Sequence, residues 1–151
     1  MTKILFICHG NICRSPMAEY VMKDLVEKKG LTDSFFVKSA ATSREEIGSG
    51  VYPPVKRILN EMGIDTKGKT AVQVTKDDYN RYDYLICMDS NNLRNLRFII
   101  GDDTENKVYR LLDFTNSPHD VADPWYTGDF ELTKQDVLIG CNALLEHILN
   151  N

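Results

Sequence analysis

The N-terminal part of the sequence carries cysteine and arginine side chains at a spacing that suits covalent chemistry on an anion. The segment Cys8-His9-Gly10-Asn11-Ile12-Cys13-Arg14-Ser15 joins a short apolar run to a helical pattern. A loop that winds into a helix N-terminus directs backbone N–H groups and the positive end of the helix dipole at an anion. Arg14 adds a planar guanidinium that can hold two phosphate oxygens. The segment therefore predicts a phosphate-binding loop.

Cys8 is the candidate nucleophile of this loop. The positive surroundings favour the thiolate, as they do for other cysteines at helix N-termini. A thiolate beneath a bound phosphate can attack phosphorus in line and form a cysteinyl phosphate, which a hydrolytic step must then clear. Gly10 and Asn11 can take left-handed backbone angles and help to point the loop amides inward. We expect Ser15 to cap the following helix, with its hydroxyl also able to reach the sulfur.

A second segment, Val121-Ala122-Asp123-Pro124-Trp125-Tyr126, supplies a candidate acid. A departing phenolate or alkoxide needs a proton, and Asp123 can give one if its loop reaches the phosphate. The two aromatic rings can form the wall of a slot for a flat ring. An Asp-Pro pair alone is a common turn, so the assignment of Asp123 as general acid depends on the cysteine loop. The residues expected to contact the substrate are His9, Gly10, Asn11, Ile12, Cys13, Trp125 and Tyr126.

Strand-like and helix-like patterns alternate along the whole chain. Strands are predicted over Lys3–Ile7, Phe35–Val37, Tyr84–Met88 and Val108–Leu112. Helices are predicted from Pro16 to Gly30, from Val55 to Gly63, after a capping box of Thr75 and Asp78, over Ser90–Ile100, and through Leu138–Ile148. Such alternation calls for a parallel sheet covered on both faces, so we expect one doubly wound α/β domain over residues 1–151. Ligands bind beyond the carboxyl ends of the strands in these folds, where the loop after the first strand lies.

Composition narrows the partners and the compartment. The 151 residues carry a net charge of -4 and no basic stripe, so nucleic acid is not an expected partner. No apolar stretch approaches the roughly 20 residues of a membrane span, and the N-terminal run is too short for a signal peptide. We therefore expect a cytoplasmic protein without membrane association. Its cysteines should be reduced, with Cys87 and Cys141 buried as small apolar residues. Cys8, His9 and Cys13 lack a fourth ligand, so no metal is expected.

Four segments match the pattern of a known enzyme family. They are Cys8-His9-Gly10-Asn11-Ile12-Cys13-Arg14-Ser15-Pro16, Ser39-Ala40-Ala41-Thr42-Ser43, Asp83-Tyr84-Leu85-Ile86-Cys87-Met88-Asp89 and Asp123-Pro124-Trp125-Tyr126. On these segments the chain resembles the low-molecular-weight protein tyrosine phosphatases over essentially its whole length. The resemblance implies a four-stranded parallel sheet, no cofactor, and hydrolysis of phosphotyrosine and aryl phosphates. Its partners would be phosphotyrosine-containing proteins or small aryl phosphates. We expect a monomer that can form a weak dimer.

The resemblance also implies roles for individual residues. Cys13 would protect Cys8 through a reversible disulfide, and Asn11, Ser15 and Ser39 would form a hydrogen-bond network that holds the loop in shape. Three positions depart from the family pattern. Arg44-Glu45-Glu46 stands where many relatives have Trp or Tyr, so one aromatic wall of the slot is missing. Trp125 stands where Tyr is commoner in the family. The histidine that supports the loop in the family is replaced near Lys69 in this chain.

Three other functions remain open alternatives. Arsenate reductases use the same fold and loop, but they need two further cysteines on a mobile segment, and Cys87 and Cys141 are far apart in the sequence. Phosphoarginine phosphatases resemble this chain too, with a threonine at the position of Ile12. A phosphocarrier module would also use Cys8, although an arginine clamp with an acid favours hydrolysis. A carrier would stop after one equivalent of phosphate.

Overall fold

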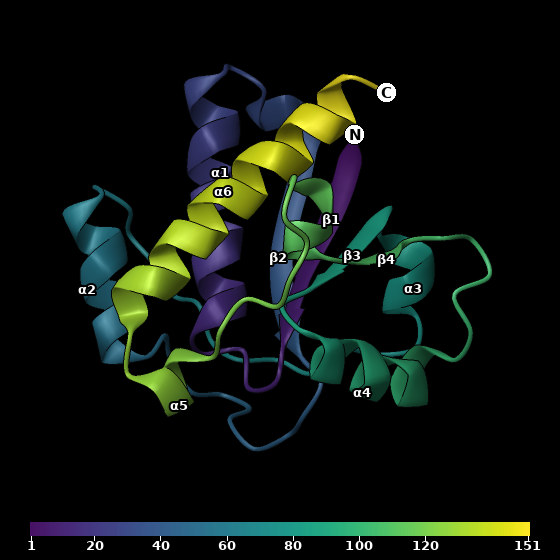
Figure 1. Cartoon of the computed structure of the whole chain (residues 1–151), viewed down its shortest axis with the longest axis horizontal. Helices are drawn as coiled ribbons and strands as arrows, with labels where there is room; N and C mark the ends of the chain where they lie inside the picture. The colour runs from purple at the N-terminus through teal and green to yellow at the C-terminus, as the bar shows by residue number, and fades with distance from the viewer.

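The fold is a parallel β-sheet of four strands with helices on both faces (Figure 1). The computed structural model describes all residues from 1 to 151. The strands are β1 (Thr2–Cys8), β2 (Phe35–Ala41), β3 (Tyr84–Cys87) and β4 (Val108–Arg110), in the order β2-β1-β3-β4. The chain moves outward from β1 to β2 and then returns to the other side of β1 with β3. The doubly wound α/β fold predicted from the sequence is therefore confirmed.

The helices divide between the two faces of the sheet. They are α1 (Arg14–Lys28), α2 (Pro53–Glu61), α3 (Asp78–Arg81), α4 (Ser90–Ile100), α5 (Pro124–Thr127) and α6 (Phe130–Leu149), with two 3-10 helices at Thr32–Ser34 and Leu111–Phe114. Helices α1, α2 and α6 pack on one face, and α3 and α4 pack on the other (Figure 1). None of these helices has the length and apolarity needed to cross a membrane.

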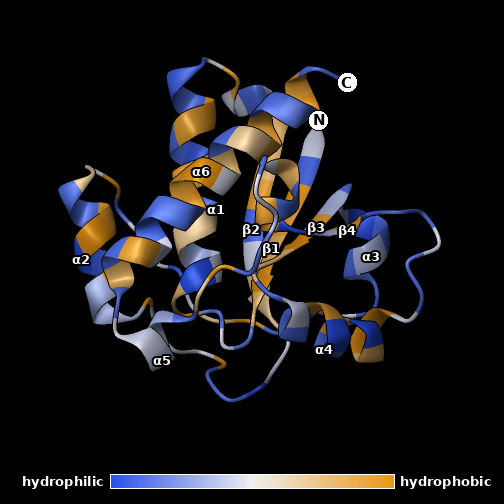
Figure 2. Ribbon diagram, in the orientation of Figure 1, coloured by the Kyte–Doolittle hydropathy of each residue, from blue (hydrophilic) through white to orange (hydrophobic).

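Successive residues of β1 enter two different hydrophobic clusters. Ile4 and Phe6 join the cluster beneath α1, α2 and α6, whereas Leu5 and Ile7 join the cluster beneath α3 and α4. All four side chains are buried. Because both faces of this strand are covered, its sequence is a continuous apolar run. Figure 2 shows the same pattern as mostly hydrophobic central strands between helices in which hydrophobic and hydrophilic residues alternate.

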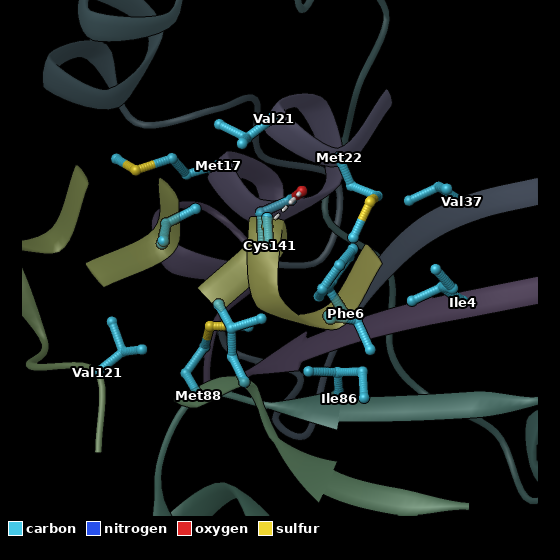
Figure 3. Close-up of a cluster of buried hydrophobic side chains, with 14 of the residues drawn as sticks. Ile4, Phe6, Met17, Val21, Met22, Val37, Ile86, Met88, Val121 and Cys141 are labelled. Carbon is cyan, nitrogen blue, oxygen red and sulfur yellow. Dashed lines mark hydrogen bonds between the residues drawn. The ribbon is translucent and has the colours of Figure 1, made fainter. Parts of the chain in front are cut away.

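The larger cluster joins α1 and α6 to the sheet (Figure 3). Cys141 of α6 lies among Met17 and Met22 of α1 and Phe6 of β1, and its Sγ is 3.7 Å from the carbonyl oxygen of Ala18. Cys141 is fully buried, as is Cys87 in the other cluster. The prediction that these two cysteines act as small buried residues is confirmed.

The start of α1 differs from the one predicted. The helix begins at Arg14, with Cys13 as its N-cap and no capping bond from a side chain. The prediction that Ser15 caps the helix is therefore wrong. The phosphate-binding loop itself winds into the helix, and the hydroxyl of Ser15 is used by Cys8 and Asn11 instead. Pro16 is tolerated in this first turn because backbone N–H groups there lack helical partners.

Two strands end two or more residues away from the predicted positions, whereas β1 and β3 differ from their predicted ends by a single residue. β2 continues past Val37 to Ala41 because its backbone stays paired with β1 up to Cys8. β4 stops at Arg110 because Leu111 and the next residues form a 3-10 helix that packs against α6. In both cases a tertiary contact sets the end of the strand.

The two shortest helices also depart from expectation. Asp77 is the N-cap of α3, and only the bond from the Thr75 N–H to Asp78 Oδ2, 2.8 Å, remains of the predicted capping box. The sequence analysis does not predict α5. This helix has Pro124 at its first position and is capped by Asp123, whose side chain accepts the N–H of Trp125 at 3.0 Å.

Candidate active site

The loop between β1 and α1 lies at the carboxyl end of the sheet, beside the point where the strand order reverses. A pocket of about 420 Å³ opens there. It is lined by Cys8, His9, Gly10, Ile12, Cys13, Arg14, Glu45, Glu46, Asp123, Trp125 and Tyr126. The structure thus brings together every predicted site residue except Asn11, Ser15 and Ser39, which form the hydrogen-bond network behind the loop. A larger groove between α4 and β4, about 760 Å³, contains no cysteine, serine, threonine or histidine side chain.

The loop turns at Asn11 and not at Gly10. Asn11 has a φ of 59°, whereas φ at Gly10 is not positive, so the expectation of a left-handed Gly10 is wrong. Asn11 Oδ1 accepts the N–H of Val72 at 3.2 Å, and its Nδ2 donates to Ser15 Oγ at 2.8 Å and Ser39 Oγ at 2.9 Å. Asn11 is only 1% exposed. Its three side-chain bonds hold the backbone in a conformation that asparagine tolerates better than most residues.

Two hydrogen-bond donors face the sulfur of Cys8. The N–H of Asn11 lies 3.3 Å from Sγ, and Ser15 Oγ lies 3.0 Å from it. The oxygen of Ser15 already accepts a bond from the Asn11 side chain, so its own hydrogen is free to point at the sulfur. Hydrogen bonds to a charged group favour its charged form. The structure therefore supports the role of Ser15 toward the sulfur rather than the role as a helix cap.

A buried carboxylate sets the direction of this network. Glu19 is 1% exposed, accepts the hydroxyl of Ser39, and pairs with Lys23 and Lys69. A carboxylate only accepts hydrogen bonds, so Ser39 must donate to Glu19 and accept from Asn11. Lys69, whose pKa is lowered by burial, also donates from Nζ to the carbonyl of Ser39 at 2.9 Å. Lys69 therefore supports the strand that holds the loop.

Arg14 is held by two carboxylates and one carbonyl group. Its Nη1 donates to Asp89 Oδ2 at 2.7 Å and to the carbonyl of Val121 at 2.9 Å, and its Nη2 lies 3.4 Å from Asp123 Oδ2. The guanidinium is only 3% exposed, and these partners offset the cost of burying its charge. The contact with Asp123 is the longest of the three, so it is the one that a bound anion would displace most easily.

Asp89 is a site residue that the sequence analysis does not assign. It lies two residues after the end of β3 and is the N-cap of α4, with Oδ1 accepting the N–H of Asn92 at 2.7 Å while Oδ2 holds Arg14. A capping aspartate at the carboxyl end of a buried strand is the signal that could have found it. Glu19 gives a comparable signal, because it is a carboxylate within the buried face of α1.

The segment that carries Asp123, the candidate general acid, brings two aromatic rings to the pocket. Asp123 is partly exposed, and Trp125 and Tyr126 beside it are 59% and 86% exposed. The ring of Tyr52 meets that of Trp125 edge-on, with 5.2 Å between their centroids, and the N–H of Tyr52 donates to the carbonyl of Ile12 at 2.9 Å. Tyr52, another residue that the sequence analysis does not assign, thus connects the aromatic wall to the phosphate-binding loop.

Cys13, the second cysteine of the loop, is chemically distinct from the candidate nucleophile. Burial and the adjacent Cys8 raise the pKa of Cys13 to about 12, so it remains a thiol at neutral pH. Both cysteines are free in this structure. Cys13 is therefore a poor nucleophile, and its protective disulfide with Cys8 stays a prediction.

Comparisons with known proteins agree with this geometry. A family model described as low molecular weight phosphotyrosine protein phosphatase matches residues 3–151. Over 150 residues, covering 98% of this chain and 96% of that protein, the chain is 41% identical to the low molecular weight protein-tyrosine-phosphatase YfkJ of Bacillus subtilis. It is 36% identical to the low molecular weight phosphotyrosine protein phosphatase of Sus scrofa over 151 residues, covering 96% of this chain and 94% of that protein.

Solved structures show the same relationship. The crystal structure of YfkJ superposes with a TM-score of 0.96 at 40% identity, covering 99% of this chain and 96% of that one. The crystal structure of a drosophila arginine phosphatase superposes with a TM-score of 0.87 at 28% identity, covering 97% of this chain and 98% of that one. The family model matches nearly the full length. The chain therefore belongs to the low molecular weight phosphotyrosine protein phosphatase family.

Proposed function

We propose that this chain hydrolyses phosphotyrosine and aryl phosphate monoesters through a cysteinyl-phosphate intermediate, with Cys8 as nucleophile, Arg14 as phosphate clamp and Asp123 as general acid. One observation carries the proposal: a single pocket holds all three side chains, and two donors face the sulfur of Cys8. Membership of the family supports the same activity. Each step below uses only side chains and backbone groups of the chain together with water.

In the first step the sulfur anion of Cys8 attacks phosphorus. The S–P bond forms, and the bond between phosphorus and the ester oxygen breaks. Arg14 and the N–H groups of the loop bind the non-bridging phosphate oxygens, which stabilises charge in the transition state. Asp123 gives its proton to the departing oxygen, and Trp125 and Tyr126 contact the aromatic ring.

In the second step a water molecule attacks the phosphorus of the intermediate. Asp123, now a carboxylate, accepts a proton from this water, and inorganic phosphate leaves as the S–P bond breaks. The bonding electrons return to the sulfur of Cys8. Ser15 and Asn11 then stabilise the anion through the O–H and N–H donors already directed at it.

We further propose that the physiological substrates are phosphotyrosine-containing proteins of the cytoplasm. A cysteine nucleophile stays active only while its thiol is reduced, and the cytosol maintains thiols in that state. The side chains of Trp125 and Tyr126 are exposed at the edge of the pocket, which leaves room for a peptide to continue beyond a bound tyrosine.

The alternative functions have less support. Arsenate reduction needs two relay cysteines on a mobile segment, but Cys87 lies in β3 and Cys141 in α6, and both are fully buried. A phosphoarginine phosphatase can have the same fold, as the drosophila protein shows. Ile12 lines the pocket of this chain, and its apolar side chain suits an aromatic ester better than a guanidinium. A phosphocarrier would stop after accepting one equivalent of phosphate.

Phosphate release tests the proposal directly. The wild-type protein should release many equivalents of phosphate from p-nitrophenyl phosphate and phosphotyrosine, and much less from phosphoarginine. Cys8→Ser should lose turnover because a serine hydroxyl is a far weaker nucleophile than a thiolate. Asp123→Asn should lower kcat/KM for phenyl phosphate, which reports the step that expels the leaving group, by about 100-fold or more, the usual size of a general-acid effect. The loss should be smaller for p-nitrophenyl phosphate, whose leaving group needs no proton.

Asp129→Asn is the matched control for the acid. Asp129 is the N-cap of α6 and lies outside the pocket, and asparagine is an equally good cap. This variant should keep wild-type kcat with both substrates. Wild-type turnover in Cys8→Ser, release of a single equivalent, or faster hydrolysis of phosphoarginine than of phosphotyrosine would each contradict the proposal.

A further inference from the structure

The pocket has one cationic side chain, which lies at its base, and two glutamates that are not paired with it. Arg14 is the only lysine or arginine of the lining, and it is buried and paired with Asp89 and Asp123. The lining also contains Glu45 and Glu46, which we call the acidic rim. A phosphate entering the pocket meets the loop amides and Arg14. The parts of a substrate that remain outside meet the acidic rim.

Glu46 is fixed in place against the phosphate-binding loop. Its Oε2 accepts the hydroxyl of Ser49 at 2.9 Å. A Cβ atom added to Gly10 would lie 3.5 Å from Glu46 Cγ, so the stem of this glutamate covers the backbone of Gly10. The carboxylate of Glu46 is therefore held at the mouth of the pocket.

Glu45 extends the acidic rim toward solvent. Its side chain is 70% exposed, and its Oε2 lies 2.8 Å from Nε2 of His9, another residue of the lining. Neither Glu45 nor Glu46 makes an ion pair with a lysine or arginine. Arg44 precedes them in the sequence but does not line the pocket. The acidic rim thus carries two carboxylates that pair with no lysine or arginine of the chain.

Such charges act on the residues that flank a bound phosphotyrosine. A lysine or arginine next to the tyrosine would be attracted to the acidic rim, and a glutamate or aspartate would be repelled. Exposed charge pairs change binding by only about two- to fivefold each. Two flanking residues acting on two carboxylates can therefore add up to a measurable preference.

We propose that Glu45 and Glu46 select phosphotyrosine substrates with lysine or arginine beside the phosphotyrosine and discriminate against acidic neighbours. This inference rests on the proposed function of the same pocket and adds the class of peptide that it prefers. The chain has negatively charged side chains where many relatives have an aromatic wall, so electrostatic attraction takes over part of the recognition that a second ring would supply.

Two phosphotyrosine peptides that differ only in their neighbours test the inference. One has lysine on each side of the phosphotyrosine and the other has glutamate. The wild-type protein should prefer the lysine peptide by about five- to tenfold in kcat/KM at low ionic strength. The difference should lie mainly in KM, because the acidic rim interacts alike with bound substrate and transition state. It should shrink as salt is added. In Glu45→Gln/Glu46→Gln the ratio should fall to about twofold or less.

Glu27→Gln/Glu61→Gln is the matched control, because it removes the same charge from two exposed sites outside the pocket and should keep the wild-type ratio. p-Nitrophenyl phosphate, which has no flanking residues, reports on the proposed function alone. Turnover of this compound with equal kcat/KM for both peptides would overturn the inference and leave the proposed function intact. A lysine preference that persists in the double variant of the acidic rim would also overturn it. No turnover of p-nitrophenyl phosphate would reject both.

Discussion

The hydrogen bonds of the Asn11 side chain offset the cost of its left-handed backbone and also position a donor beside the nucleophile. For a residue other than glycine, a backbone with a φ of 59° is roughly 1–2 kcal/mol less favourable than one in the right-handed region. The difference is smaller for asparagine. Each of its three side-chain hydrogen bonds contributes about 1 kcal/mol. The backbone N–H of the same residue then points at Cys8. One side chain therefore fixes both the turn of the loop and a donor to the sulfur.

The two cysteines of the loop should differ sharply in reactivity. At pH 7 a thiol with a pKa of about 12 is ionised in about one molecule in 10⁵, so Cys13 should resist iodoacetamide. Cys8 faces two donors in the same pocket and should be carboxamidomethylated. Peptide mass spectrometry after brief treatment measures both sites. Inorganic phosphate should slow the labelling of Cys8, and labelling of Cys13 at a comparable rate would contradict the assignment.

At this scale the sequence predicts the reacting residues better than their supports. Cys8 and Arg14 are recognisable because their spacing is local, within one loop. Glu19 and Asp89 contact the site from other elements, so their roles depend on contacts that only the folded chain creates. Ser15 shows why local rules fail here: its hydroxyl could serve the helix or the sulfur, and the tertiary network decides.

At the scale of elements, α6 can approach the 3-10 helix Leu111–Phe114 because Gly140 has no side chain. A Cβ at this position would lie 2.4 Å from Leu111 Cγ, closer than any real contact. Leu111 is fully buried and has no free space to move into. The two elements therefore fit together only with glycine at position 140.

Gly140→Ala should destabilise the protein by about 1–3 kcal/mol, the usual cost of overpacking a core. At an open helix position the same change would stabilise the protein by roughly 1 kcal/mol. The sign of the change in unfolding free energy therefore distinguishes a close-packed position from an open one. Urea denaturation measures the difference in unfolding free energy. In Gly140→Ala/Leu111→Ala the clash is removed, and the loss should be smaller than the sum of the two single losses. A single variant as stable as the wild type would show that the helices can separate without cost.

The elements also differ in how well their sequences predict them. The bounds of α4 are predicted correctly because Asp89 caps its start and Gly101 follows its end. α5 escapes prediction because four residues are too few for a helical period. β4 is predicted too long, since Leu111 and Leu112 are apolar in either structure and only packing against α6 selects the 3-10 helix.

At the scale of the whole molecule, the thiols buried on both sides of the sheet make the stability of the fold depend on pH in the alkaline range. Burial raises the pKa of Cys87 and Cys141 well above the ordinary value of 9.0, and burial together with Cys8 raises the pKa of Cys13 to about 12. Above pH 9 the unfolded chain would release these three protons while the folded chain keeps them. The folded state then binds more protons, so its stability must fall as pH rises.

The free energy of unfolding should therefore be nearly level from pH 7 to 8.5 and decline above pH 9. Each thiol contributes up to about 1.4 kcal/mol per pH unit, so three together approach about 4 kcal/mol per unit. Urea denaturation with a reductant, read between pH 9 and 9.5, keeps the ionisation of tyrosine in the unfolded chain below about a quarter. Burial also raises the pKa of Tyr20, Tyr79, Tyr82 and Tyr84, so these side chains add a smaller decline of the same sign. Cys141→Ala lacks one of the three thiols, so its decline should be shallower by about a quarter even though its stability at neutral pH is lower. Equal slopes in the two proteins would mean that other groups control the alkaline limit, because removing a buried proton-binding site must otherwise flatten the curve.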